Sequence, residues 1–271
     1  MDGRSPKRRR SDALGPFALL LVLLLTFPLA GCGSAVASSP SDPLLVSAAA
    51  SLTDPFTELA QEFQQEHGVP VTLNFGASGQ LAQQIEQGAP VDLFASANRA
   101  YVDELAQAGL LLPDTLTVYA RGRLTLWVPK DSPLTLTGIQ DLIRPEITRI
   151  ALANPAHAPY GQAAQEALQA AGVWEEVRPK LVFGENIAQA YQYAETGNVD
   201  VAILALSLSV TSQGRWLLVP QELHRPLDQA MAVVAGAPQE ELARAFLAFV
   251  TGPTGQATLE RYGFQPVEAR P

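Results

Sequence analysis

The sequence contains a single cysteine, Cys32, and only three histidines among its 271 residues. One cysteine excludes any disulfide within the chain. The histidines His67, His157 and His224 lie far apart and have no ligand-like spacing among themselves or with Cys32. A zinc site is therefore not expected.

Common catalytic and nucleotide-binding signatures are also missing. The chain has no Gly-x-Ser-x-Gly segment, which marks the nucleophile turn of many hydrolases. The small-residue turn at 76–79, Gly-Ala-Ser-Gly, lacks the Lys-Ser/Thr of a phosphate-binding loop. We therefore predict no catalytic residue, no cofactor and no ATP binding. A hydrolase or transferase remains the alternative from a different functional class.

Positive charge is scarce. The chain has 18 Lys and Arg against 27 Asp and Glu, for a net charge of -9. Residues 1–31 carry five Lys or Arg and two Asp, so the rest of the chain has a net charge of -12. Nucleic acid is an unlikely partner for so acidic a body. No Lys or Arg occurs in three long stretches, which are 32–98, 150–177 and 181–214.

The N-terminus has the layout of an export signal. A basic segment precedes an apolar run from Ala13 to Ala30, and Cys32 follows shortly after. This pattern predicts a signal peptide over residues 1–31 and a lipid-modified Cys32, as in exported bacterial lipoproteins. Residues 32–42 then form a flexible tether of about 15–20 Å. The alternative is an uncleaved membrane anchor. In both cases the body lies outside the cytoplasm.

The segment Leu44–Asp54, LLVSAAASLTD, organises the first part of the chain. A short apolar run ends at Ser51, and apolar residues then recur at helical spacing with Pro55 placed early. The pattern predicts a buried strand, a turn of small residues and a helix. Free N–H groups at such a helix start, together with a serine hydroxyl, can surround an anion. The alternative is that Ser51 only caps the helix.

A second copy of this arrangement follows. The strand at 69–75 leads into the turn at 76–79, which contains Ser78, and then into a short helix. A third strand at 91–96 is also followed by a helical pattern. Alternating strands and helices predict a mostly parallel sheet with helices on both sides. Ligands of such sheets bind at the carboxyl ends of the strands, where Ser51 and Ser78 fall.

A second series of strands and helices begins at Leu124. We predict two lobes, one formed by residues 43–121 plus 228–271 and the other by residues 122–227. The chain would cross between them near 120–123 and 226–228. A cleft between such lobes can close around a small ligand by a hinge motion.

The turns that would face this cleft lie in the stretches without Lys or Arg. A bound dianion would then be held by neutral N–H and O–H donors. Each charge-assisted hydrogen bond contributes about 1.5–3 kcal/mol, so several of them can give micromolar affinity or better. The alternative is that Arg99, Arg121 or Lys130 approaches the ligand in space.

Five segments of the sequence resemble the molybdate-binding proteins of ABC transporters. They are AAASLTDPF, FGASGQLAQQI, GAPVDLFASA, NPAHAPYGQAAQEAL and GPTGQATLERYGF, and they occur in the family's order between Leu44 and Phe264. The resemblance implies an α/β fold of the periplasmic-binding-protein type II class. It would have two lobes, each with a mostly parallel sheet flanked by helices, and the ligand in the cleft between them.

The resemblance also implies a set of ligand residues. Ser51 and Ser78 match the family's two hydroxyl ligands. Tyr160 falls where the family contributes a backbone N–H or, in some members, a tyrosine, and Ile187 matches a residue that contributes a backbone N–H. Part of the family has a ligand tyrosine where this chain has Ala205, so we expect Tyr160 to supply the missing phenol.

The implied function is capture of molybdate or tungstate and its delivery to an ABC permease in the membrane. We expect the protein to act as a monomer, anchored through Cys32, with no cofactor and no enzymatic activity. Within the same class, the alternative is a carrier of sulfate, phosphate or a ferric complex. Molybdate and sulfate are both tetrahedral dianions, so cavity size would distinguish them.

Overall fold

The structure of the protein is a computed structural model, and it describes residues 42–267. The predicted signal peptide, Cys32 and the tether up to residue 41 lie outside the described residues and stay predictions. Among the residues that are described, no helix is both long enough and apolar enough to cross a membrane.

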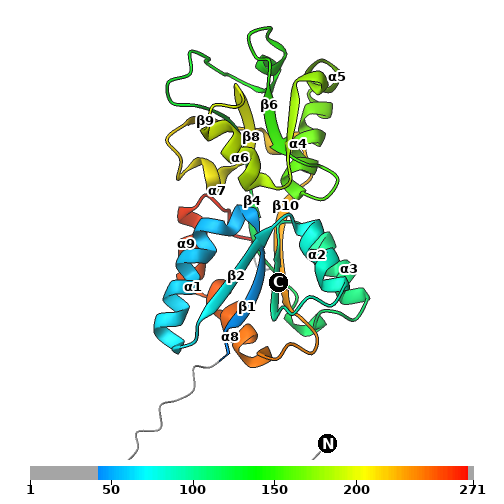
Figure 1. The fold of residues 1–271 in the computed structure, drawn as a ribbon, viewed down its shortest axis with the longest axis vertical. Coiled ribbons are helices and arrows are strands. Elements are labelled where there is room, and N and C mark those ends of the chain that lie inside the picture. The colour runs from blue at the N-terminus through cyan, green and yellow to red at the C-terminus, as the bar shows by residue number, and fades with distance from the viewer. Residues whose placement is uncertain (1–41, 268–271) are drawn as a thin grey trace, which may run out of the picture. The chain divides into compact units, whose positions relative to one another are not determined.

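The first of two five-stranded sheets has the order β2-β1-β3-β10-β4. Its strands are β1 (Leu44–Ala49), β2 (Val71–Gly76), β3 (Leu93–Ser96), β4 (Thr117–Gly122) and β10 (Leu227–Val233). The helices that flank this sheet are α1 (Thr53–His67), α2 (Ser78–Glu86), α3 (Arg99–Gln107), α8 (Glu240–Thr251) and α9 (Pro253–Arg261). We call this sheet with its helices the first lobe (Figure 1).

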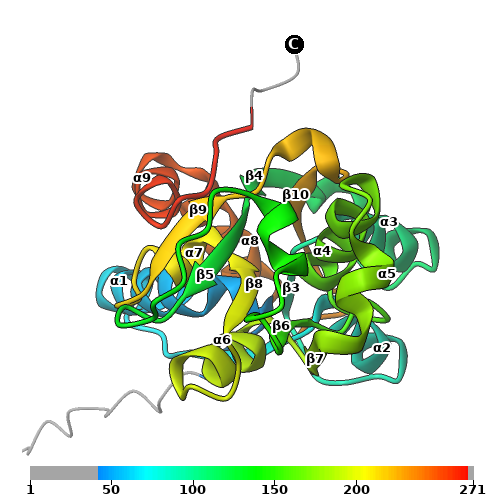
Figure 2. The ribbon, with the colours of Figure 1, turned by 90° about the horizontal axis from the view of Figure 1, so that it is seen from above.

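The second sheet has the order β7-β6-β8-β5-β9. Its strands are β5 (Leu124–Val128), β6 (Ile150–Ala153), β7 (Leu181–Gly184), β8 (Val201–Ala205) and β9 (Arg215–Leu218). The accompanying helices are α4 (Pro159–Ala170), α5 (Trp174–Val177), α6 (Ile187–Glu195) and α7 (Leu206–Ser209). We call this group the second lobe, and Figure 2 shows α4 and α6 beside its strands. The exact residue division between the lobes stays a prediction.

Both sheets are mixed. In each, two strand pairs are parallel and two are antiparallel. The prediction of mostly parallel sheets is therefore wrong in this detail. The reason is that β4 leads directly into β5 while β10 brings the chain back, and these strands have no crossover helix to make them parallel to their neighbours.

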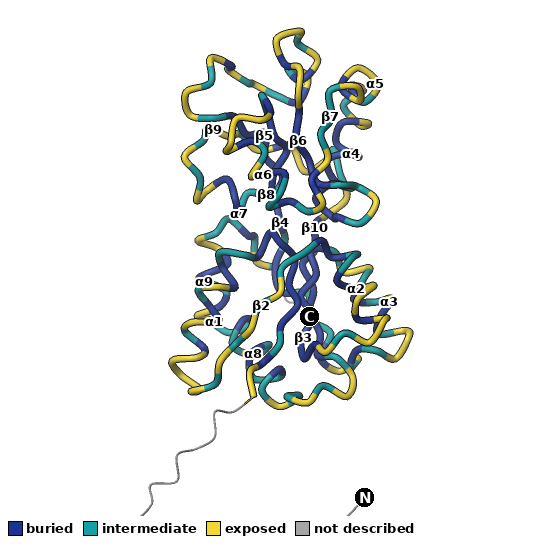
Figure 3. The backbone as a smooth tube through the Cα atoms, viewed as in Figure 1, coloured by how far each residue is buried: buried dark blue, intermediate teal, exposed yellow. Residues whose placement is uncertain are grey.

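Packing of the strands places the predicted turns together. The inner strands of both sheets are buried along most of their length, as Figure 3 shows, whereas the edge strands β2, β7 and β9 are largely half-buried or exposed. β1 and β2 are parallel and in register, with Ala49 opposite Gly76. The segments after these two strands carry Ser51 and Ser78, so the two turns emerge side by side from one edge of the first sheet.

Candidate functional site

Ser51 follows β1 in a short 3-10 helix, Ala50–Leu52, and α1 begins after it. No side chain caps either helix. Ser51 is buried, and its Oγ has no hydrogen-bond partner among residues 42–267. The alternative that Ser51 merely caps α1 is therefore wrong, and its hydroxyl is available to a ligand.

Ser78 is the first residue of α2 and is also buried. Its Oγ accepts a hydrogen bond from the backbone N–H of Ala97, which follows β3, at 3.0 Å. A hydroxyl has one hydrogen to donate besides the lone pairs with which it accepts. Because the Ala97 N–H occupies a lone pair, the Ser78 O–H hydrogen remains free to be donated to a ligand.

The second lobe brings Tyr160 and Ile187 to the same place. Tyr160 lies in the first turn of α4, directly after Pro159, and its side chain is buried. Ile187 is the first residue of α6. The Asn186 side chain caps α6 by accepting from the N–H groups of Ala188 and Gln189, and it leaves the N–H of Ile187 unused by the cap.

The Tyr160 phenol is held in its neutral form. Burial raises the pKa of Tyr160 well above its usual value near 10, and the neighbouring Ser51 hydroxyl offsets only part of that rise. A neutral phenol keeps its hydrogen and can donate it to an anion. Tyr160 therefore keeps an O–H hydrogen that it can donate at physiological pH.

All four predicted ligand residues line one small cavity, which is partly open to solvent. Its lining residues come from both lobes and are Ala49, Ala50, Ser51, Gly76, Ala77, Ser78, Ala97, Ala158, Pro159, Tyr160, Asn186 and Ile187. None of these residues carries a charge. What the cavity offers is a set of hydroxyl groups and helix-start N–H groups, which is suited to a small acceptor such as an oxyanion.

The cations that were the alternative, Arg99, Arg121 and Lys130, do not line the cavity. Arg99 pairs with Asp103 at 3.0 Å, and Arg121 pairs with Asp228 at 2.8 Å. Any anion in this cavity would be held by dipoles and hydrogen bonds.

Hydrogen bonds join the two lobes around the cavity. The Gly79 N–H donates to the His157 carbonyl oxygen at 2.9 Å, and the Ser207 hydroxyl donates to the Ser51 carbonyl oxygen at 2.7 Å. Farther out, the Gln80 amide donates to the Glu185 carboxylate at 2.9 Å. These contacts describe a closed arrangement of the lobes.

Comparison with known proteins identifies the family of this chain. Residues 44–265 match the model of the bacterial extracellular solute-binding proteins. The chain belongs to this family. The molybdate-binding protein ModA of Rhodobacter capsulatus is 34% identical over 252 residues, which cover 92% of this chain and 95% of that relative. The putative ABC transporter substrate-binding lipoprotein YvgL of Bacillus subtilis (strain 168) is 29% identical, covering 92% of this chain and 97% of that relative.

A solved structure agrees as well. The periplasmic molybdate-binding protein of Azotobacter vinelandii matches this solute-binding protein with a TM-score of 0.79 at 25% identity. The match covers 83% of this chain and 100% of that one. The predicted periplasmic-binding-protein type II fold and the resemblance to molybdate-binding proteins are thus confirmed. The ligand roles of Ser51, Ser78, Tyr160 and Ile187 stay predictions.

The structure of this solute-binding protein also adds residues that the sequence analysis did not single out. Asn186 orients the start of α6, and an Asn directly before a helical pattern is a recognisable cap signal. Ala97 donates its backbone N–H to Ser78 Oγ, and no sequence pattern predicts this hydrogen bond. Ala205 is buried at the end of β8, while Tyr160 is among the residues that line the cavity.

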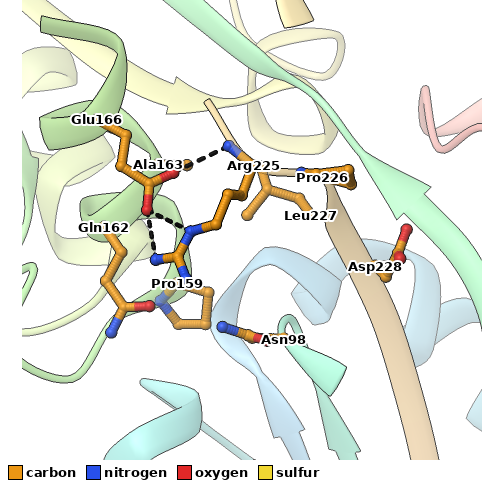
Figure 4. A pocket seen from close by; sticks show the side chains of 9 residues that line it. All are labelled: Asn98, Pro159, Gln162, Ala163, Glu166, Arg225, Pro226, Leu227 and Asp228. Atoms are coloured by element: carbon orange, nitrogen blue, oxygen red, sulfur yellow. Dashed lines mark hydrogen bonds and ion pairs between the residues drawn. The ribbon is translucent and has the colours of Figure 1, made fainter. Parts of the chain in front are cut away.

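A second, larger hollow of about 610 Å³ lies near the strands that connect the lobes (Figure 4). Glu166 of α4 pairs there with Arg225, whose Nε lies 2.7 Å from the carboxylate and whose backbone N–H donates to it at 2.9 Å. Glu166 is paired with Arg225 and Asp228 with Arg121, so the described residues that line this hollow have no unpaired positive charge to offer a dianion. This hollow is therefore a poor oxyanion site despite its size.

The part of the chain that is described offers no alternative metal centre. No group of three or more His, Cys, Asp or Glu side chains between residues 42 and 267 is arranged to hold a metal ion. The His157 ring instead joins two loops of the second lobe, because it lies 2.8 Å from the Glu185 carbonyl oxygen.

Proposed function

We propose that this solute-binding protein captures molybdate or tungstate outside the cytoplasm and delivers it to an ABC permease in the membrane. The observation that carries the proposal is the uncharged cavity in which Ser51 and Ser78 of one lobe meet Tyr160 and Ile187 of the other. The names of the relatives, which include molybdate-binding proteins, support the same ligand class.

The donor set suits a deprotonated metal oxyanion. Molybdate at neutral pH offers only acceptors, and the cavity offers hydroxyl and N–H donors. Each charge-assisted hydrogen bond would contribute about 1.5–3 kcal/mol, which is enough in sum for tight binding after ordering costs. In this proposal the Tyr160 phenol takes the place of the tyrosine that part of the family has at the position of Ala205.

Selectivity against sulfate would come from size. Sulfate has the same shape and the same acceptors as molybdate but is smaller, so it would leave some donors out of hydrogen-bonding range. A carrier for sulfate, phosphate or a ferric complex is the alternative within this class. Because the family consists of solute-binding proteins, we further propose that the protein has no enzymatic activity and needs no cofactor.

We also propose that Cys32 carries a lipid that anchors the monomeric protein to the membrane. The predicted signal sequence supports this, as does the relative YvgL, whose name describes it as a lipoprotein. Labelling of the expressed chain with a fatty-acid probe should mark the wild type and leave Cys32→Ser unmarked.

Isothermal titration tests the ligand directly. Molybdate and tungstate should bind tightly, and sulfate should bind at least a hundredfold more weakly. A thermal-shift screen of oxyanions provides a second reading, because a ligand at 100 times its dissociation constant stabilises the fold by about 2.7 kcal/mol. Sulfate affinity equal to that of molybdate would reject the size argument, and binding of another solute alone would replace the proposal by its alternative.

A further inference from the structure

Gln229 is a fully buried polar residue on β10, outside the predicted ligand set. Its position follows from a shift of register between Gln229 and Ala230, where β10 pairs with β4. Such an irregularity re-aims a side chain relative to a regular strand. Here the side chain points toward the segments that carry the cavity residues.

Two backbone carbonyls determine how the Gln229 amide is oriented. Its Nε2 donates to the Leu227 carbonyl oxygen at 2.9 Å and to the Ala97 carbonyl oxygen at 3.4 Å. A carbonyl oxygen only accepts, so the nitrogen of the amide must face both of them. The Oε1 atom is left without a hydrogen-bond partner among the described residues.

Through Ala97, Gln229 is linked to the hydroxyl of Ser78. The Ala97 carbonyl accepts from Gln229, and the Ala97 N–H donates to Ser78 Oγ at 3.0 Å. Ala97 is thus held on one side by Gln229 and supports Ser78 on the other. Loss of the amide would release the segment that directs the Ser78 hydrogen into the cavity.

Gln229 also lies close to the hydroxyl of Tyr160. A side chain at Gly122 would collide with the Tyr160 hydroxyl, and its Cβ would stand 3.1 Å from Gln229 Nε2. The phenol oxygen and the amide nitrogen therefore share the space that Gly122 leaves open. Nε2 is a donor, so the Tyr160 hydrogen would form no hydrogen bond if it turned toward this nitrogen.

We propose that Gln229 is a positioning residue for oxyanion binding, which supports Ser78 through Ala97 and directs the Tyr160 hydrogen into the cavity. It does not touch the ligand. Gln229 lies in the first lobe and Tyr160 in the second, so the amide and the phenol meet only when the lobes are closed. This inference rests on the proposed function and adds a residue to the machinery of the same site.

The test is a set of mutant cycles read by isothermal titration with molybdate. Gln229→Met keeps the length of the side chain and removes the amide. We expect it to weaken molybdate binding about tenfold in the wild type. Adding Gln229→Met to Ser78→Ala or to Tyr160→Phe should cause a smaller loss of affinity than it causes in the wild type. Added to the Ser78→Ala, Tyr160→Phe double variant, it should weaken binding by less than about twofold.

Thr115→Val is the matched control. Thr115 Oγ1 accepts from the Val233 N–H of the same strand, β10, but does not line the cavity. Thr115→Val should lower the melting temperature and leave the molybdate affinity within twofold of wild type. If Gln229→Met does not fold, Gln229→Asn, which withdraws the amide by one methylene, replaces it with the same expectation.

The outcomes separate the two proposals. An equal loss in every background, or no loss in the wild type, would overturn the role of Gln229 while wild-type binding upholds the function. A wild type that binds neither molybdate nor tungstate would overturn both.

Discussion

The Ser207 hydroxyl, in α7 of the second lobe, donates a 2.7 Å hydrogen bond to the carbonyl oxygen of Ser51 in the first lobe. Both residues are buried. The bond attaches the segment after Ala205 directly to the turn that presents a ligand hydroxyl. In this chain, closure is thus supported by a serine two residues beyond the position where part of the family has its tyrosine.

Ser207→Ala should weaken molybdate binding by about 0.5–1.5 kcal/mol, because the bond exists only between closed lobes. Titration calorimetry measures the change. Ser209→Ala is the matched control, since its Oγ bonds only within the second lobe, to Thr125 and the Ala205 carbonyl. It should lower the melting temperature without changing affinity. Equal affinity losses in both variants would contradict a role in closure.

Gly79 allows the lobes to approach closely. A Cβ at this residue would stand 2.8 Å from the His157 carbonyl oxygen and 2.8 Å from the Tyr101 hydroxyl. Gly79→Ala should therefore hinder closure and weaken molybdate binding at least tenfold, or about 1.4 kcal/mol.

Small-angle scattering can follow this effect, because the radius of gyration of Gly79→Ala should change less on adding molybdate than that of the wild type. Gly138→Ala serves as the control, since its nearest neighbour, Gln140 Oε1, would be an acceptable 3.4 Å from the new Cβ. Wild-type affinity in Gly79→Ala would mean that the lobes bind the ligand without this close approach.

The two serines should differ in what they do to the fold. Ser51→Ala removes a hydroxyl that has no partner among residues 42–267, so the ligand-free melting temperature should stay the same or rise. Ser78→Ala leaves the buried Ala97 N–H without its acceptor and should cost about 1–3 kcal/mol of stability.

Both serine variants should weaken molybdate binding by about 1–3 kcal/mol. Thermal denaturation without ligand, followed by calorimetry with molybdate, gives the two quantities separately. Unchanged affinity in both variants would move the binding site away from this cavity.

Alkaline pH should reduce stability through tyrosines whose pKa is raised in the folded protein. Burial raises the pKa of Tyr160, and burial together with the nearby Glu195 raises the pKa of Tyr191 to about 12. The phenols of the unfolded chain ionise near pH 10. The extra stability from a raised pKa is thus complete below about pH 10 and is lost as the pH rises toward the folded-state value.

Urea unfolding between pH 8 and 10.5 measures this loss, which should be smaller in Tyr160→Phe than in the wild type. Molybdate affinity of the wild type should stay constant up to about pH 9.5, since the Tyr160 hydrogen is retained. Identical pH dependence of unfolding in the two proteins would show that the Tyr160 phenol ionises as it does in water.

Several elements were predictable because local pattern and tertiary packing demand the same residues. The strands predicted at 69–75 and 91–96 correspond to β2 and β3, with ends that differ by at most two residues, and β5 begins at Leu124, where the second series was expected. The strand β4 was missed as an element, and only a crossing near 120–123 was expected there. Its side chains alternate weakly, and it is specified by pairing with β10, which is over a hundred residues away.

The candidate site also contains residues that could be predicted and residues that could not. Ser51 and Ser78 were recognisable because each lies where a strand gives way to a helix, and such signals involve neighbours in sequence. Tyr160 and Ile187 were implied only by the resemblance to the molybdate-binding proteins. The contributions of Gln229, Gly122 and Ala97 were not recognisable, because each depends on an approach between segments that are distant in the chain.

The sequence by itself determined most of the order of strands and helices and the uncharged character of the turns, since apolar periodicity, small-residue turns and the absence of Lys and Arg are local properties. The resemblance to the family rested on five segments of the sequence. Only the tertiary structure decided that the two serines share one cavity with Tyr160, that the sheets are mixed and that Gln229 lies beside Ala97 and Tyr160. Those features depend on which distant segments pair, and pairing is determined by the packing of the whole chain.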